Sequence, residues 1–410
     1  MNRIVFVVMS LLILSCNGSI EQEEEPGYDR NKFFVVDYES VLNNKAQINL
    51  SELTDDIEYI PLETNENCLL HRMAEYFFTD DFIFVDNSTH ILQFDRSGKF
   101  IKQIGKPGRG PEEIGLIRQL SVLDEQKQLL VQTNWAHKLY YFSYDGDFIK
   151  TAPFNGNEIW KIKAVPDNRL VYFNTCHSGQ EDYMFALTSQ AGDILDVVHN
   201  HYKWEDSFHS GQSINYSSFV PFYFYNNTLS FKSMHNDTVY TVYGDSIRAD
   251  YLVDLGDLQL PQEYRLETYK KLAPWNEFYE KAKGHRFCSV FEAKEMLFIS
   301  SSDYKDYNTA YNMIYDRPTG SGRLLVDMHN DPGMIINDID GGPDFWPLGT
   351  VNDSTVYMPV LPLDLKNKDF RDKLAKAEGV DPEKKNDLIK MIDGLSESDN
   401  SVLMIVGLNK

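Results

Sequence analysis

Short runs of apolar residues, separated by clusters of Asp, Asn, Ser and Gly, recur along most of this chain. The clearest copy spans residues 81–105, where the apolar runs 82–85, 91–94 and 100–104 are each followed by polar residues or glycine. Apolar runs of this length between turn-forming residues predict antiparallel strands joined by tight turns.

The same pattern returns at a nearly constant interval. Residues 128–154, 168–198 and 225–255 repeat it. The glycines of the last turn in the first four copies are 48, 46 and 52 residues apart: Gly98, Gly146, Gly192 and Gly244. A fifth copy, 295–328, follows an additional helix-like stretch at 261–284. A period of about 45 residues with four strands is the size of a β-propeller blade.

A sixth copy begins at residues 354–360 and resumes at 401–408, after a charged and helix-like stretch at 365–391. It lacks an outer strand, which residues 47–63 can supply. Closing the ring with both ends of the chain removes the exposed sheet edges that promote aggregation. The sequence therefore predicts an all-β fold, a six-bladed β-propeller closed by N- and C-terminal strands, with short helical insertions at about 261–284 and 365–391.

The N-terminal residues have a different pattern. A largely apolar run at 4–14 follows one basic residue and ends just before Cys16. This run is too short to span a bilayer and has the length of a signal-peptide core. The residues that end at Cys16 resemble the bacterial lipobox, in which the cysteine is lipidated and becomes the new N-terminus. We predict a lipoprotein signal peptide at 1–15, a lipidated acidic tether at 16–30 and the propeller at 31–410; the alternative is an ordinary signal peptide.

Residues 17–26 are polar and strongly acidic, as expected of a solvated tether. They also resemble the acidic export signal that directs Bacteroidetes lipoproteins to the outer face of the outer membrane. This resemblance implies an outer-membrane lipoprotein, exposed at the cell surface, which contacts the membrane through its lipid anchor only.

Five segments together resemble the six-bladed, NHL-like β-propeller lipoprotein family of Bacteroidetes. They are residues 57–64 (IEYIPLET), 94–100 (FDRSGKF), 105–113 (GKPGRGPEE), 337–343 (NDIDGGP) and 399–403 (DNSVL). Ser401 departs from the family, which usually has proline there. The resemblance covers nearly the whole mature chain. It implies the fold and the lipoprotein class but says little about activity, because one fold carries many functions.

Charge and cysteine content exclude several classes of partner. The chain has 39 basic and 62 acidic residues, a net charge of −23. That charge repels phosphate backbones, so no nucleic-acid partner is expected. Cys68, Cys176 and Cys288 lie far apart and show no CxxC or Cys/His spacing, which argues against a disulfide framework or a zinc site.

The most site-like segment carries three carboxylates within seven residues, Asp338, Asp340 and Asp344, followed by Trp346. Carboxylate oxygens are ligands that Ca²⁺ prefers, so these three residues are the candidate metal ligands and Ca²⁺ is the candidate cofactor. The spacing is not that of an EF-hand. Trp346 could stack on a sugar ring. The alternative is an acidic turn that leads into a strand, with Trp346 in the core.

Two further residues complete the set of candidate ligand-binding residues, which also contains Asp340, Asp344 and Trp346. Arg109 lies in the glycine-rich segment 105–113, which lacks the spacing of a phosphate-binding loop and fits a connection between blades. Arg109 would bind ligand only if it points into the central funnel. Trp135 follows a strand of the second blade. No catalytic residue is assigned.

The leading functional hypothesis is a non-catalytic envelope protein whose propeller face binds a ligand or a protein partner, such as a glycan or an envelope protein. The alternative is a lactonase-like or lyase-like enzyme that uses a divalent metal ion in the central funnel. A third hypothesis is a structural scaffold. Binding predicts aromatic and polar side chains along the funnel, catalysis predicts three or four converging carboxylate, Asn or His groups, and a scaffold predicts a plain funnel and an apolar outer patch.

Overall fold

The computed structural model describes residues 32–71, 74–110, 112–134, 138–154, 159–176, 180–189, 191–201, 203, 221–261, 263–264, 275–305 and 309–409. The chain divides into a segment of residues 1–32 and a compact unit, Phe33–Lys410. The predicted signal peptide, tether and lipidation site at Cys16 lie outside the described residues. Among the described residues, no helix is both long and apolar enough to cross a membrane.

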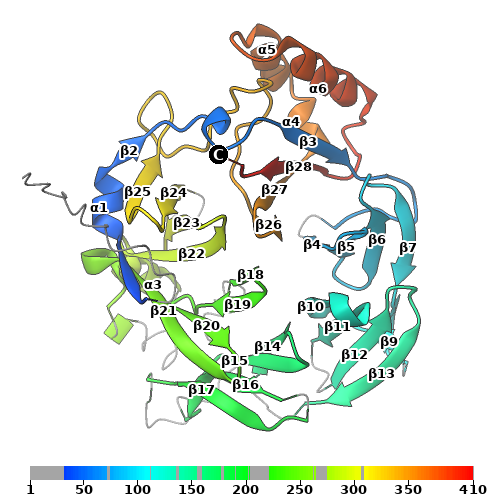
Figure 1. The fold of residues 1–410 in the computed structure, drawn as a ribbon, viewed down its shortest axis with the longest axis vertical. Coiled ribbons are helices and arrows are strands. Elements are labelled where there is room, and N and C mark those ends of the chain that lie inside the picture. The colour runs from blue at the N-terminus through cyan, green and yellow to red at the C-terminus, as the bar shows by residue number, and fades with distance from the viewer. Residues whose placement is uncertain are drawn as a thin grey trace, which may run out of the picture. The chain divides into compact units, whose positions relative to one another are not determined.

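The compact unit is a ring of four-stranded antiparallel sheets around a central axis, and the strands of each blade follow one another in the chain (Figure 1). The first blade contains β4 (Glu75–Phe78), β5 (Phe82–Asp86), β6 (Ile91–Asp95) and β7 (Phe100–Ile104). The second contains β10 (Ile117–Leu123), β11 (Gln128–Thr133), β12 (Lys138–Ser143) and β13 (Phe148–Pro153). The third contains β14 (Ile159–Val165), β15 (Arg169–Asn174), β16 (Tyr183–Thr188) and β17 (Ile194–His199).

The second half of the ring repeats this order. The fourth blade contains β18 (Phe222–Tyr225), β19 (Thr228–Phe231), β20 (Thr238–Tyr243) and β21 (Ser246–Asp254). The fifth contains β22 (Arg286–Ala293), β23 (Met296–Asp303), β24 (Ala310–Asp316) and β25 (Ser321–Leu325). The sixth contains β26 (Gly349–Asn352), β27 (Thr355–Val360), β28 (Val402–Gly407) and the N-terminal strand β3 (Ile57–Pro61).

The sixth blade closes the ring as the sequence predicts. β3 pairs antiparallel with β28, and Ile60 lies opposite Leu403. Both side chains are buried. The predicted fold class, a six-bladed β-propeller with short helices, is therefore confirmed. Two further N-terminal strands were not predicted: β1 (Phe34–Asp37) and β2 (Lys45–Ala46) add in parallel to the outer edges of the fourth and fifth blades, at β21 and β25.

The repeating turn glycines lie between the third and fourth strands of their blades and have the left-handed backbone that glycine adopts without strain. Gly98 has φ +85° and Gly146 has φ +92°. A Cβ atom at Gly98 would also collide with the carbonyl oxygen of Pro61, because the turn of the first blade packs against β3 of the sixth. The sequence repeat therefore marks the outer part of each blade.

The hydrophobic core lies between neighbouring blades. Phe84 of the first blade and Leu129 of the second belong to one buried cluster, and Phe185 of the third and Phe231 of the fourth belong to another. The ring centroids of Phe185 and Phe231 are 4.5 Å apart. Every sheet and core cluster found in the described residues lies after Lys32. The unit Phe33–Lys410 thus supplies its own core and strand pairings and can fold without the preceding residues.

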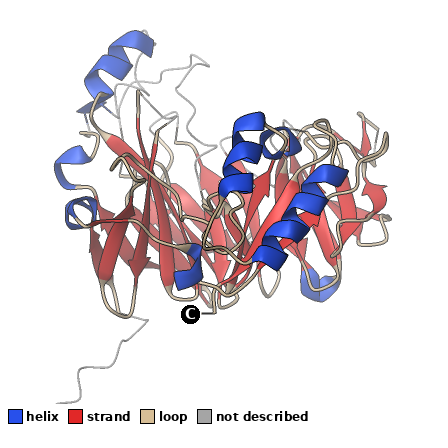
Figure 2. Ribbon diagram, turned by 90° about the horizontal axis from the view of Figure 1, so that it is seen from above, coloured by secondary structure: helices blue, strands red, loops and turns tan. Residues whose placement is uncertain are grey.

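Helices lie at the periphery of the ring (Figure 2). α1 (Tyr38–Asn43) follows β1, and α3 (Trp275–Ala282) lies in the connection between the fourth and fifth blades. α4 (Pro362–Leu365), α5 (Lys368–Lys376) and α6 (Pro382–Gly394) lie between β27 and β28. These three helices bury Leu365, Leu374, Leu388 and Ile392 in the cluster that also contains the sixth blade.

Candidate functional site

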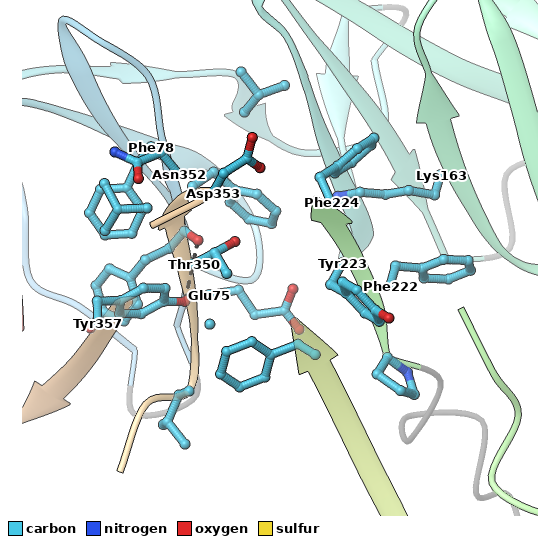
Figure 3. Close-up of a pocket in the computed structure, with 18 of the residues that line it drawn as sticks. Glu75, Phe78, Lys163, Phe222, Tyr223, Phe224, Thr350, Asn352, Asp353 and Tyr357 are labelled. Atoms are coloured by element: carbon cyan, nitrogen blue, oxygen red, sulfur yellow. Dashed lines mark hydrogen bonds between the residues drawn. The ribbon is translucent and has the colours of Figure 1, made fainter. Parts of the chain in front are cut away.

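A cavity of about 800 Å³ occupies the centre of the ring. Residues of the first strand of every blade line it: β4, β10, β14, β18, β22 and β26. The first strand of each sheet lies nearest the axis, so its side chains face either the neighbouring blades or this central channel (Figure 1). Figure 3 shows side chains from β4, β14, β18 and the sixth blade around this space.

The wall of the channel is rich in aromatic side chains. They are Tyr76, Phe77, Phe78, Phe222, Tyr223, Phe224, Phe291, Phe298, Trp346 and Tyr357. Several of these rings pack on one another, as Phe78 does on Tyr357 with ring centroids 4.8 Å apart. Aromatic faces of this kind provide large apolar contact areas with little loss of side-chain entropy on binding.

One end of the channel is formed by the turns between the first and second strands of the blades. Asp353 of the sixth blade accepts a hydrogen bond at Oδ1 from the backbone N–H of Asn226 in the fourth, at 2.8 Å. Its backbone carbonyl accepts another from the N–H of Lys294 in the fifth, at 2.7 Å. Asp124 and Glu125 of the second blade also line this end. The turns are thus tied together, and the end carries acidic groups.

Another part of the wall carries a basic group, Lys163. Lys163 on β14 is buried and lines the channel; its Nζ donates to the Leu120 carbonyl on β10 at 3.1 Å and lies 4.9 Å from the ring centroid of Phe77 on β4. Burial lowers the pKa of Lys163 to about 8. Lys161 lies two residues earlier on the same face of β14, and burial lowers its pKa as well.

Arg118, at the start of β10, extends this basic group. Its guanidinium carbon lies 3.4 Å from the ring centroid of Trp160 on β14, a close cation–π stack. Burial lowers the pKa of Arg118 to about 10. Its Nη1 atom is buried and donates to no acceptor among the described residues. A buried donor without a partner is rare in folded proteins and calls for a physical explanation.

Glu75, the first residue of β4, places a carboxylate beside these cations. It lines the channel, and Figure 3 shows its carboxylate pointing into the open space between the sixth blade and β18. Its negative charge partly offsets the effect of burial on the pKa values of Lys161 and Lys163. Asp86, at the end of β5, is the next carboxyl group: burial, with a smaller contribution from Glu75, raises its pKa to about 7.

Three of the predicted ligand-binding residues, Arg109, Asp340 and Asp344, are described by the structure but do not line the channel, whereas Trp346 does. Arg109 is exposed in the connection between β8 (Lys106–Pro107) and β9 (Glu113–Ile114), and it is not among the residues that line the cavity. Trp135 lies outside the described residues, in the link between β11 and β12.

The structure separates the three predicted metal ligands. Asp338 accepts hydrogen bonds from the backbone N–H and the Oγ of Ser51, at 2.9 and 2.5 Å. Asp340 is buried, and its Oδ1 accepts from Asn337 Nδ2 and the Gly342 N–H, both at 2.8 Å.

Asp344 pairs instead with Lys373 of α5, at 3.2 Å. The backbone N–H of Asn337 also donates to Asp344 Oδ1, at 3.3 Å, so Asn337 holds both Asp340 and Asp344. Protein donors therefore occupy at least one oxygen of each of the three carboxylates. Within the described ranges, no three His, Cys, Asp or Glu residues are grouped so that they could hold a metal ion.

Trp346 is buried, as the core interpretation of the sequence expects, and its stacking on a sugar ring stays a prediction. The side chain is buried in the core between the fifth and sixth blades, and it also lines the channel. Its Nε1 donates to Ser300 Oγ at 2.8 Å, and its ring meets Phe298 edge-on with centroids 5.8 Å apart. Trp346 is therefore a fixed part of the wall.

The sequence analysis did not identify Glu75, Arg118, Trp160, Lys161 or Lys163. One feature of the sequence could have pointed to the two lysines. The segment WKIKAV, residues 160–165, alternates lysine with Ile162 and Ala164 in the first strand of its blade. Lysine is rarely buried without a partner, so two lysines on one face of an otherwise apolar strand are unusual enough to suggest a site.

Comparison with known proteins supports the fold. Residues 33–407 match the profile of a family described as a domain of unknown function (DUF4934). A protein from Bacteroides fragilis NCTC 9343, whose name describes it as exported, is similar at 17% identity with a TM-score of 0.68, over 92% of this chain and 100% of that one.

More distant similarities reach a member of the DUF4221 family from Bacteroides vulgatus (11% identity, TM-score 0.45, 67% of this chain and 84% of that one). Another is a protein of unknown function from Bacteroides thetaiotaomicron (9% identity, TM-score 0.40, 88% of this chain and 75% of that one). No protein with a curated description matches the chain. The similarity to the Bacteroides fragilis protein, at 17% identity, bears on the fold alone.

Proposed function

The chain belongs to the DUF4934 family, and we propose that it is a non-catalytic binding protein of the cell envelope that holds a small ligand in the central channel of its propeller. The observation that carries this proposal is the channel itself. It has a volume of about 800 Å³, and aromatic and polar side chains from all six blades line it. Ligand pockets in proteins have this size and this mixture of apolar walls and a few placed polar groups.

Of the three hypotheses, ligand binding agrees best with the residues that line the channel. A scaffold needs no aromatic channel. Metal-dependent catalysis needs converging ligands, and within the part of the chain that the structure describes no such group is found. Glu75 is the carboxylate that points into the open channel in Figure 3, and the nearby Asp86 has a raised pKa because it is buried. No observation therefore favours a lactonase or lyase.

The location is part of the proposal. The apolar run before Cys16 and the acidic residues after it support a lipoprotein anchored in the outer membrane and exposed at the surface. The segments such as residues 57–64 and 94–100 support the NHL-like lipoprotein class. A glycan fragment or another small envelope molecule would suit the channel, whereas an envelope protein partner would bind the outer faces of the blades.

The test is a titration with a neutral fluorescent aromatic probe, N-phenylnaphthylamine. The chain from residue 17 onward is used, because it contains the whole compact unit and needs no detergent, which would take up the probe. Ser289 on β22 opens to the channel, so Ser289→Trp fills the cavity with a bulky side chain. The matched control is Ser398→Trp, which places the same residue on an exposed loop.

We expect the probe to bind the wild-type protein and Ser398→Trp with one saturable site. Ser289→Trp should weaken that binding about tenfold or more, because the added indole occupies the volume that the probe needs. If all three proteins bind the probe equally, or none binds it, the channel is not a ligand site and the proposed function fails.

A further inference from the structure

Three cationic side chains from two neighbouring inner strands lie close together, and one of them, Lys163, lines the channel. Arg118 is the second residue of β10, and Lys161 and Lys163 lie on the same face of β14. Each of the lysines has a pKa that responds to a neighbouring cation, Lys161 to Arg118 and Lys163 to Lys161, so the three charges act on one another. Three neighbouring positive charges are unexpected in a chain whose net charge is −23. The composition of the chain therefore does not explain why they lie together.

These cations lack the partners that the protein gives its other buried cations. Arg317, also buried, forms an ion pair with Glu292 at 2.8 Å, and Lys232 lies 3.8 Å from Asp237. Among the described residues, Arg118, Lys161 and Lys163 have no carboxylate within 4.0 Å. We call these three residues the basic cluster.

Leaving the basic cluster without a direct ion pair costs folding free energy, because burial removes water from these charges and the Glu75 carboxylate offsets only part of that effect. The lowered pKa values of all three groups show that cost. The buried Nη1 of Arg118 adds an unsatisfied donor. Groups held in this state at a cavity wall regain the lost interaction energy when an anion binds beside them.

We infer that the basic cluster is a subsite for the acidic group of an organic anion, a carboxylate or sulfonate attached to a ring that packs against the aromatic wall. This inference rests on the proposed function, since the ring needs the channel. Trp160 fixes the plane of the Arg118 guanidinium, which favours the paired hydrogen bonds that guanidinium groups make to oxyanions. Lys163 supplies charge deeper in the channel.

The rest of the channel orients the anion. Asp124, Glu125 and Asp353 line the end formed by the turns, and they repel an acidic group. Glu75 faces the open space beside the basic cluster and excludes a second anion there. A ligand with one acidic group and one uncharged ring is therefore accommodated in a single orientation.

The test compares two probes with nearly the same rings. Anilinonaphthalene sulfonate carries an acidic group, and N-phenylnaphthylamine lacks it. Lys161→Gln is the main variant, because Lys161 is less buried than Lys163 and its replacement is least disruptive. Arg118→Gln is the second variant, in case the first fails to fold. Lys150→Gln, on the exposed outer strand β13, is the matched control.

We expect the dissociation constant for the sulfonate to rise about tenfold in Lys161→Gln and Arg118→Gln, and binding of the neutral probe to change less than about twofold. Lys150→Gln should match the wild type with both probes. If both probes bind and neither variant distinguishes them, the anion subsite is wrong while the channel remains a binding site. If neither probe binds the wild-type protein, the proposed function itself fails.

Discussion

The ammonium group of Lys163 lies 4.9 Å from the ring centroid of Phe77, although the two residues belong to the third and first blades. Lys163 thus reaches past the inner strand of the second blade, where it also donates to the Leu120 carbonyl. Side chains of three blades form one continuous surface at this part of the channel. A change at any of them affects both the stability of the ring and the chemistry of the channel.

Lys163→Met should stabilise the protein at pH 7. The folded-state pKa of Lys163 is about 8 and the unfolded-state value is about 10.4, so folding disfavours the charged form. The free-energy cost of keeping Lys163 charged in the folded state is fully present below pH 8 and disappears as the pH rises to about 10.5. Removing it raises the free energy of unfolding by up to about 3 kcal/mol, less the lost contacts with Leu120 and Phe77.

Urea unfolding of the wild type and Lys163→Met at pH 7 and pH 9.5 measures this difference. The advantage of the variant should be larger at pH 7 than at pH 9.5. The same variant should bind anilinonaphthalene sulfonate more weakly than the wild type does. A variant that is less stable at pH 7 and equally good at binding would mean that Lys163 is a structural residue only.

Asp86→Asn should also stabilise the protein, with the opposite dependence on pH. Burial raises the pKa of Asp86 to about 7, so the folded state disfavours the ionised form. The free-energy cost of ionising Asp86 in the folded state is absent below about pH 4, grows as the pH rises to 7 and is constant above pH 7. The variant should gain up to about 4 kcal/mol at pH 8, because an Asn oxygen can still accept from the Ser88 N–H.

Thermal unfolding of Asp86→Asn and the wild type across pH 4 to 8 tests this. The gap between the two melting temperatures should widen with pH. A constant gap would show that Asp86 is not the group that titrates, and Asp81→Asn, at an exposed bend between β4 and β5, provides the comparison.

Glu75→Gln should strengthen anion binding. The Glu75 carboxylate faces the channel beside the basic cluster and repels an incoming acidic group. Its neutralisation should lower the dissociation constant for anilinonaphthalene sulfonate by about three- to tenfold and leave that of N-phenylnaphthylamine unchanged. Titration of both probes measures the effect. A weaker sulfonate affinity in this variant would place the anion elsewhere.

Calcium should leave the melting temperature unchanged. Asp338, Asp340 and Asp344 are held by Ser51, Asn337 and Lys373, so no set of free oxygens faces a common point. Thermal unfolding with millimolar Ca²⁺ and then with EDTA is the measurement. A rise in melting temperature with Ca²⁺ that EDTA reverses would restore the metal site that the sequence indicated.

The fold was largely predictable because the outer strands of each blade repeat a local signal. The turn at Gly98 needs a residue that tolerates positive φ, and the flanking strands β6 and β7 pair with each other across it. The strands β1 and β2 escaped prediction because β2 has only two residues and both add in parallel to edges that the repeat already completes.

The site was less predictable because it consists of the least repetitive strands. β4, β14 and β18 differ from one another in sequence, since each places different side chains on the channel. Their cluster forms only when the ring brings residues 75, 118 and 163 together. The acidic segment around Asp340 shows the opposite case: three carboxylates close in sequence accept hydrogen bonds or ion pairs from Ser51, Asn337 and Lys373 of the protein itself.

Diffraction from crystals soaked with para-iodobenzoate tests the central claim most directly, because anomalous scattering locates the iodine and the density locates the carboxylate. We predict one strong iodine peak inside the channel, among the rings of the wall, with the carboxylate directed at Arg118 and Lys161. An occupied channel with the carboxylate turned toward Asp124 would contradict the anion subsite. An empty channel in saturated crystals would contradict the binding function as a whole.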